Sequence, residues 1–210
     1  MTASLARTST VPFIAPWSSE ATPAQYLVCS ALHGVLAYTD EQPDDRAFGA
    51  LWNRRGSSPG VGRPEFGNIH PRRQLAAMRD LGCQVCGQPA DQDDRGVLWL
   101  LEDNRNDWPD WPNELMTTHP PICLPHAREA VTACPHLVDG YVVVRVGESE
   151  PVAVYGRHYA IERGRIVPNR REVVELDSAR LQWTVAGQLI RDLRRCKIVD
   201  LAAEPGTVRP

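Results

Sequence analysis

The stretch YVVVRVGESEPVAVYGRHYAIERGRIV, residues 141–167, is rich in the β-branched and aromatic residues that pleated strands favour. It predicts three antiparallel strands, at residues 141–146, 151–162 and 165–167. The polar residues Glu148–Glu150 mark the first turn, and Arg163 with Gly164 marks the second. The sequence therefore predicts a C-terminal antiparallel sheet.

The segment that follows, SARLQWTVAGQLIRDLRRCK at residues 178–197, predicts an amphipathic helix. Leu181, Val185, Leu189 and Leu193 recur every four residues, as on one face of a helix, and the basic residues near the end favour the helix dipole. Earlier in the chain, residues 71–81 begin with proline and predict a short helix, and residues 96–101 predict a strand. The predicted fold class is α+β, ending in this terminal amphipathic helix.

Two pairs of metal-binding residues lie on either side of the predicted strand. The first is the CxxC of CQVCG, where two intervening residues let the backbone present Cys83 and Cys86 to one ion, and Gly87 suits the tight turn. The second is Cys123 with His126, which share a face at the start of a helix predicted over residues 124–134. Four such ligands favour a closed, structural Zn²⁺ site, because a catalytic zinc keeps one position open for water.

Cys134 and His136 are alternative metal ligands. Along a continuous helix rising about 1.5 Å per residue, Cys134 would lie about 16 Å from Cys123. One ion cannot reach both thiols, so we expect Cys134 and His136 to lie outside the site.

A second metal would need further ligands, for which His119 and His158 are the candidates. The remaining cysteines, Cys29 and Cys196, stand among apolar neighbours. We expect both to be small core residues.

The order CxxC, 36 intervening residues and CxxH resembles the treble-clef zinc fold, in which a zinc knuckle and a helix N-terminus each supply one ligand pair. HNH endonucleases share this arrangement, and the resemblance covers about residues 78–137 only. In that family a histidine on the strand after the knuckle is the general base. Here the region reads LWLLEDNRND and offers Asp103 and Asn104 but no imidazole. The resemblance thus implies a degenerate HNH-like module without the catalytic histidine.

Charge is distributed unevenly along the chain. The basic segment, residues 46–80, has seven arginines against two acids, whereas residues 91–114 have eight acids against two arginines. Basic surfaces attract phosphates, so nucleic acid is one candidate partner; two solvated faces of opposite sign are the alternative interpretation. The arginines expected to contact phosphate are Arg54, Arg55, Arg63, Arg72 and Arg73.

The sequence predicts four segments. They are a flexible arm (1–23), an α/β segment with an Arg- and Gly-rich loop (24–69), a zinc-binding treble-clef-like module (70–138), and antiparallel strands plus a helix (139–210). One compact domain over 24–210 is the alternative. The sequence lacks both a run of about 20 apolar residues and the apolar core of a secretory signal, so we expect a cytoplasmic protein without a membrane partner.

These features predict a non-catalytic, zinc-stabilised binding protein that contacts nucleic acid or a protein partner. Two alternatives stay open: a divergent HNH-like, metal-dependent nuclease, and a protein–protein adaptor with no role in nucleic-acid binding. No residue is assigned a catalytic role, and the sequence does not define the oligomeric state.

Overall fold

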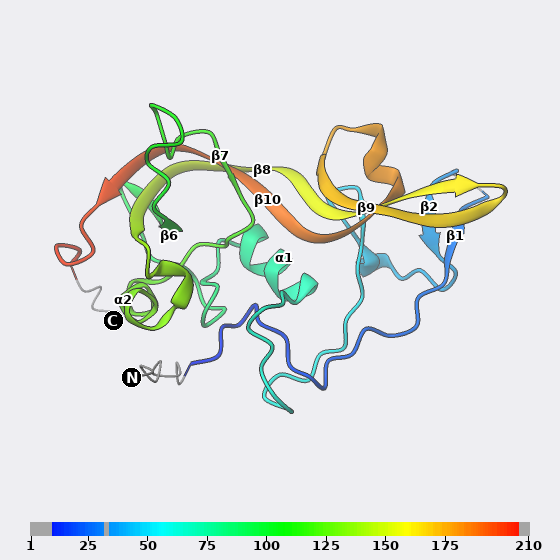
Figure 1. Cartoon of the computed structure of the whole chain (residues 1–210), viewed down its shortest axis with the longest axis horizontal. Helices are drawn as coiled ribbons and strands as arrows, with labels where there is room; N and C mark the ends of the chain where they lie inside the picture. Colours follow the sequence, from blue (N-terminus) through cyan, green and yellow to red (C-terminus); the bar gives the residue numbers. More distant parts are fainter. Residues whose placement is uncertain (1–9, 32–33, 206–210) are drawn as a thin grey trace. The chain divides into compact units, whose positions relative to one another are not determined.

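The computed structural model describes residues 10–31 and 34–205. The chain divides into two compact units, each assembled from separated segments (Figure 1). Unit 1 comprises Met1–Phe13, Ala76–Glu150 and Asp192–Pro210, and unit 2 comprises Ile14–Leu75 and Pro151–Arg191.

Most regular structure in the described residues is β. The strands are β1 (Leu27–Cys29), β2 (Leu36–Tyr38), β3 (Arg46–Ala47), β4 (Ala50–Trp52), β5 (Gln92–Asp93), β6 (Gly96–Glu102), β7 (Leu115–Thr117), β8 (Tyr141–Glu162), β9 (Arg165–Glu175) and β10 (Thr184–Val199). The helices are α1 (Pro71–Arg79) and α2 (Leu124–Ala133), with 3-10 turns at Pro43–Asp45, Pro135–Leu137 and Ala179–Trp183. The hydrogen-bonded strand order is β3-β4-β10-β8-β6-β5, with β7 paired to β10 and β9 to β8, while β1 and β2 form a separate hairpin.

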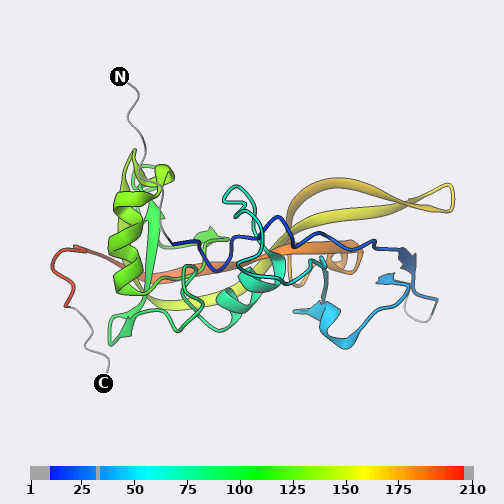
Figure 2. The same ribbon diagram turned by 90° about the horizontal axis from the view of Figure 1, so that it is seen from below.

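In unit 1, β6 pairs antiparallel with the first part of β8. Side chains alternate between the faces of a strand, and here both faces are covered. Leu98 and Leu100 join a core with α2, whereas Val97, Trp99 and Leu101 join a second core with Trp111 and Leu193. Burial on both faces explains why this strand reads as a continuous apolar run. Figure 2 shows α2 alongside β6.

In unit 2, β4 runs parallel to β10 and antiparallel to β3. Gln74 on α1 is fully buried and bonds to the backbone of β10: its amide donates to the Leu189 carbonyl at 2.9 Å, and the Leu189 N–H donates back at 2.8 Å. A side chain thus takes the place of a neighbouring strand at that residue.

The predicted α+β fold class, with a treble-clef-like module, is wrong. Within the described residues the structure is mainly β, and α1 and α2 are short. The helices predicted at 71–81 and 124–134 and the strand predicted at 96–101 are confirmed, but they accompany a large sheet.

The predicted terminal amphipathic helix over residues 178–197 is also wrong. Residues 179–183 form a 3-10 turn and the remainder is strand β10. Residues four apart lie on the same face of a strand as well as of a helix, so the spacing of the leucines does not separate the two. From Leu189 to Leu193 every residue is buried, which is the pattern of a strand covered on both faces.

The turn predicted at Glu148–Glu150 is wrong, because β8 continues through it. Glu148 and Glu150 are exposed to solvent on this continuous strand. The second predicted turn is confirmed: Arg163 and Gly164 both have positive φ, 48° and 76°, and connect β8 to β9. No helix in the described part of the chain is long and apolar enough to cross a membrane.

Candidate metal centre

The CxxC forms a tight knuckle in unit 1. Its backbone is closed by hydrogen bonds from the Gly87 N–H to the Cys83 carbonyl at 2.8 Å and from the Cys83 N–H to the Gln88 carbonyl at 2.7 Å. Gly87 has φ of 71°, and a Cβ there would lie 2.9 Å from the ring of Phe13. Glycine is therefore required both by the turn and by the packing of Phe13.

The second ligand pair lies at the start of α2. Cys123 is the N-cap residue, and its carbonyl accepts the first helical bond from the Ala127 N–H at 2.9 Å. His126 lies one turn further on, which places its ring next to the Cys123 thiol. The Ile122 N–H donates to the Leu98 carbonyl at 3.0 Å, so β6 fixes the position of the helix start.

The structure brings the four predicted ligands together. One ligand atom from each of Cys83, Cys86, Cys123 and His126 lies within 4.8 Å of every other. Nδ1 of His126 is 2.9 Å from Sγ of Cys123 and 3.8 Å from Sγ of Cys83. A zinc tetrahedron with bonds of about 2.3 Å to sulfur and about 2.0 Å to nitrogen has edges of about 3.5–3.8 Å. The observed separations lie on both sides of these values, so small side-chain shifts would let one ion bind all four atoms, and three thiols with one imidazole are a donor set that suits zinc.

The three thiols change one another's ionisation. The hydrogen bond between the Cys123 and Cys83 side chains lowers the pKa of Cys83 to about 4 and raises the pKa of Cys123. Burial raises the pKa of Cys86, and the charge of Cys83 adds to that effect. The protein groups alone thus favour one thiolate among three cysteines. A divalent cation supplies the positive charge that would ionise the other two.

The cluster is part of the hydrophobic core of unit 1. Cys83 and Cys123 pack with Leu98, Ile122 and Leu124, and Cys83 is fully buried. The Val85 N–H lies 3.4 Å from Sγ of Cys83 and can donate to its thiolate. Four potential ligands would leave no open position on a tetrahedral ion, whereas a catalytic metal needs one.

The alternative ligands lie elsewhere. Cys134 is the C-cap of α2, and His136 is exposed in the 3-10 turn that follows. His119 is exposed, and Nδ1 of His158 on β8 lies 3.5 Å from the Thr184 hydroxyl. Among the described residues, the one group of three or more potential ligands within metal-binding distance is the Cys83, Cys86, Cys123 and His126 cluster.

The two remaining cysteines differ from each other. The expectation that Cys29 is a core residue is wrong, because it is exposed on β1, a strand of the separate two-stranded hairpin. Cys196 is partly buried against the core of unit 1, as expected, and burial raises its pKa to about 12.

Most arginines of the basic segment are paired with carboxylates of unit 2 or, for Arg79, of unit 1. Arg54 bonds Asp45 at 2.5 Å and Asp40 at 2.8 Å and lies over the Tyr38 ring. The other ion pairs are Arg46–Glu41, Arg55–Glu65, Arg72–Asp45, Arg73–Glu20 and Arg79–Asp80. Arg63 is exposed and joins no ion pair within the residues described. Four of the five arginines predicted to contact phosphate therefore already have anionic partners inside the protein.

Asp103, the carboxylate considered in the nuclease alternative, lies just after β6. Arg105 pairs with it at 2.7 Å, and that contact holds the pKa of Asp103 below its ordinary value. A carboxylate with a lowered pKa is a weak general base at neutral pH.

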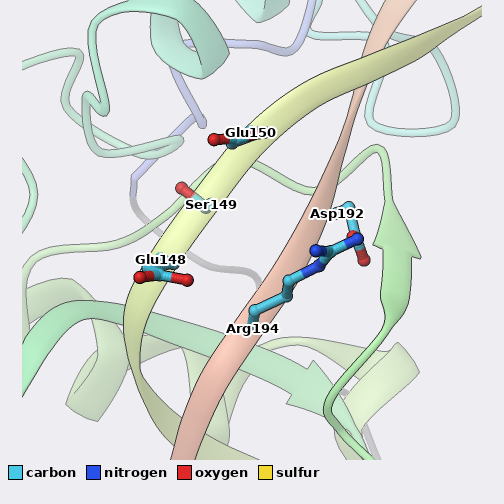
Figure 3. Close-up of a pocket in the computed structure, with 5 residues that line it drawn as sticks. All are labelled: Glu148, Ser149, Glu150, Asp192 and Arg194. Carbon is cyan, nitrogen blue, oxygen red and sulfur yellow. The ribbon is translucent and has the colours of Figure 1, made fainter.

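A small pocket lies between β8 and β10 in unit 1. Figure 3 shows the residues that line it, Glu148, Ser149 and Glu150 on β8 and Asp192 and Arg194 on β10. Its volume is about 50 Å³, far below the roughly 300–1,000 Å³ of small-molecule sites. Arg194 already pairs with Asp192 at 2.7 Å.

A buried ion cluster in unit 1 was not foreseen from the sequence. Arg145 on β8 is 2% exposed and pairs with Asp91 at 2.7 Å and with Glu204, which also pairs with Arg95 at 2.8 Å. The sequence feature that could have indicated it is Arg145 within the apolar run YVVVRV, because a charged side chain buried in a strand requires an oppositely charged partner. The cluster ties the chain after β10 to the sheet.

Comparison of the chain with protein-family models, with curated proteins and with solved structures found no match.

Proposed function

We propose that this chain is a non-catalytic binding protein stabilised by a structural zinc ion. The observation that carries the proposal is the convergence of Cys83, Cys86, Cys123 and His126 within 4.8 Å. Two of these ligands come from the knuckle and two from α2, so one ion would join segments 36 residues apart in the chain. Metal binding of this kind adds directly to folding free energy.

A structural role for the metal has two supports. All four positions of a tetrahedral ion would be filled by protein atoms, and the thiols of Cys83 and Cys123 face the core. The ion would therefore hold the knuckle, β6 and α2 in place while the binding surface lies elsewhere.

Nucleic acid is the partner that we propose, with a protein partner as the alternative. The arginines expected from sequence to make this contact carry the proposal only weakly, because ion pairs already hold Arg54, Arg55, Arg72 and Arg73. Arg63 is the member of that set with an exposed side chain and no such pair in the part of the chain described.

Two measurements on the purified chain test the proposal. Elemental analysis should give about one zinc per chain, and fluorescence anisotropy should detect binding to labelled DNA at low salt with a steep loss at higher salt. A chain that folds without metal contradicts the structural-zinc proposal. Zinc without any DNA or RNA binding leaves the protein partner. Plasmid cleavage that requires added metal and is lost in Asp103→Ala would instead establish a nuclease.

A further inference from the structure

The end of the β8–β9 hairpin is strongly basic. We call residues 157–171 the distal hairpin; it contains five arginines and one acid, Glu162, for a formal charge of +4. The arginines are Arg157, Arg163, Arg165, Arg170 and Arg171. Figure 1 shows this hairpin ending in a tip at the right of the view.

The arginines of the distal hairpin are more available than those of the basic segment. Arg163, Arg165 and Arg171 are exposed, and none forms an ion pair with another described residue. Arg170 pairs with Glu172 at 3.2 Å, and Arg157 donates to the Asn169 carbonyl at 2.9 Å. In the basic segment, by contrast, six of seven arginines are paired with carboxylates. The unneutralised positive charge of unit 2 is therefore concentrated on the hairpin.

The register of the hairpin places two like charges together. Arg157 on β8 lies directly opposite Arg171 on β9. Like charges at opposed positions destabilise an antiparallel pair, and a bound anion would remove that repulsion. Both positive charges also act on the neighbouring Tyr159: burial raises the pKa of Tyr159, and Arg157 and Arg171 each oppose that rise.

The turn at the tip holds a further arginine at a backbone cost. Arg163 has φ of 48°, a conformation that asparagine or glycine adopts more readily in two-residue hairpin turns. Its side chain is thus presented at the tip by a turn for which other residues fit better. The exposed guanidinium of Arg163 therefore adds positive charge at the tip of the hairpin.

We propose that the distal hairpin binds the phosphate backbone of duplex DNA through Arg163, Arg165 and Arg171. This inference rests on the proposed function for the class of partner and assigns the surface that contacts it. A two-stranded β-ribbon fits the major groove of B-form DNA, about 12 Å wide, whereas the A-form major groove of double-stranded RNA is too narrow for it. Exposed arginines along such a ribbon reach the phosphates on the groove edges.

The test compares three triple variants in the full-length, zinc-loaded chain. R163N/R165Q/R171Q removes the charges and places a favourable residue in the turn, and R163K/R165K/R171K keeps the charges. The control, R105Q/R194Q/R195Q, removes three exposed arginines of unit 1, whose side chains are 53%, 65% and 75% exposed and pair with carboxylates. Thermal unfolding of each variant checks that the fold is retained.

Binding of a fluorescein-labelled DNA duplex is measured by anisotropy between about 50 and 200 mM salt. Loss of three phosphate contacts should make the slope of log affinity against log salt shallower by about 2.7, at about 0.9 per contact. The lysine variant and the control should retain the slope of the unmodified chain.

Each alternative outcome has a definite meaning. If the unmodified chain binds DNA and the R163N/R165Q/R171Q variant loses no more than the control, the hairpin assignment is wrong while the proposed function stands. If the unmodified chain binds no nucleic acid, the hairpin assignment and the proposed nucleic-acid partner are both wrong, and the protein partner is left. Tighter binding to double-stranded RNA, to single strands or to vesicles containing phosphatidylserine than to duplex DNA overturns the assignment of the occupant.

Discussion

Replacing Cys123 by serine removes one of the four proposed zinc ligands with little change in side-chain volume. Cys123 is 4% exposed, caps α2 and lies 2.9 Å from Nδ1 of His126. Structural zinc contributes about 10–16 kcal/mol of apparent binding free energy in small zinc domains, so one ligand in four accounts for about 3 kcal/mol. For a chain of this size each kcal/mol shifts the unfolding temperature by about 2–4 °C. We expect Cys123→Ser to unfold about 6–12 °C lower.

Cys134→Ser is the matched control, because Cys134 ends the same helix but lies outside the cluster. Thermal unfolding followed by circular dichroism, together with elemental analysis, should show about one zinc and a small shift for Cys134→Ser, and substoichiometric zinc with the large shift for Cys123→Ser. A chelator should bring the unmodified chain at least as low as Cys123→Ser. The reasoning is refuted if both variants keep full zinc occupancy and unfold at the same temperature.

Three further predictions concern polar groups in the core. Gln74→Ala should lower the free energy of unfolding by about 2–4 kcal/mol, because it leaves the buried N–H and carbonyl of Leu189 without their hydrogen-bond partner. Chemical denaturation measures this free energy, and a loss below about 0.5 kcal/mol would contradict the prediction. Glu204→Gln should cost about 3 kcal/mol by leaving Arg145 undercompensated, although Asp91 still pairs with it; an unchanged denaturation midpoint would argue against the ion cluster. Burial raises the pKa of Glu20, but hydrogen bonds from two backbone N–H groups and an arginine outweigh it and lower the pKa below the ordinary value. The ionised Glu20 carboxylate therefore contributes its full stabilisation above about pH 4.3, and this stabilisation is lost as pH falls through the pKa of the folded state. Glu20→Gln should accordingly reduce the loss of unfolding free energy on acidification, measured by denaturation at a series of pH values.

The cluster of four potential metal ligands could be predicted from the sequence because its geometry is local. The knuckle needs two residues between cysteines and a following Gly87 with positive φ, and the helix pair needs a spacing of three. Each half is set by a few neighbouring residues, so the pattern survives whatever fold surrounds it. That independence is also why the same pattern led to the wrong fold class.

The sheet was harder to predict because its strands carry ambiguous periodicity. Leu181, Val185, Leu189 and Leu193 are four residues apart, and both a helix and a strand place such residues on one side. The residues between these leucines distinguish a helix from a strand. Ile190 and its neighbours are buried as well, which requires that both faces of the strand are covered. That cover comes from distant parts of the chain, and no short window of sequence reports it.

The prediction of a nucleic-acid surface from the basic segment stays a prediction, and the structure changes the charge argument behind it. Counting charges within residues 46–80 finds seven arginines against two acids, but four of the arginines pair with acids outside that window. Glu41 pairs with Arg46, Asp45 with Arg54 and Arg72, and Glu20 with Arg73. Asp45 is nearly buried, so it acts as an anion within unit 2 and not as part of the surface. Charge becomes a guide to partners only after the ion pairs inside the fold have been subtracted.

The division of the chain into units has a consequence for dissecting it by truncation. Unit 1 draws on three stretches of sequence and unit 2 on two, and three of the four crossings between them fall inside α1, β8 and β10. Residues 76–150 contain every ligand of the metal centre but lack Leu193, which completes a core of unit 1. A fragment of residues 76–150 would therefore contain all four potential metal ligands but lack part of the hydrophobic core that supports them. Loss of binding in a deletion fragment would therefore not locate a binding surface, because the fragment also loses part of its fold, and surface substitutions in the intact chain are the better way to test one.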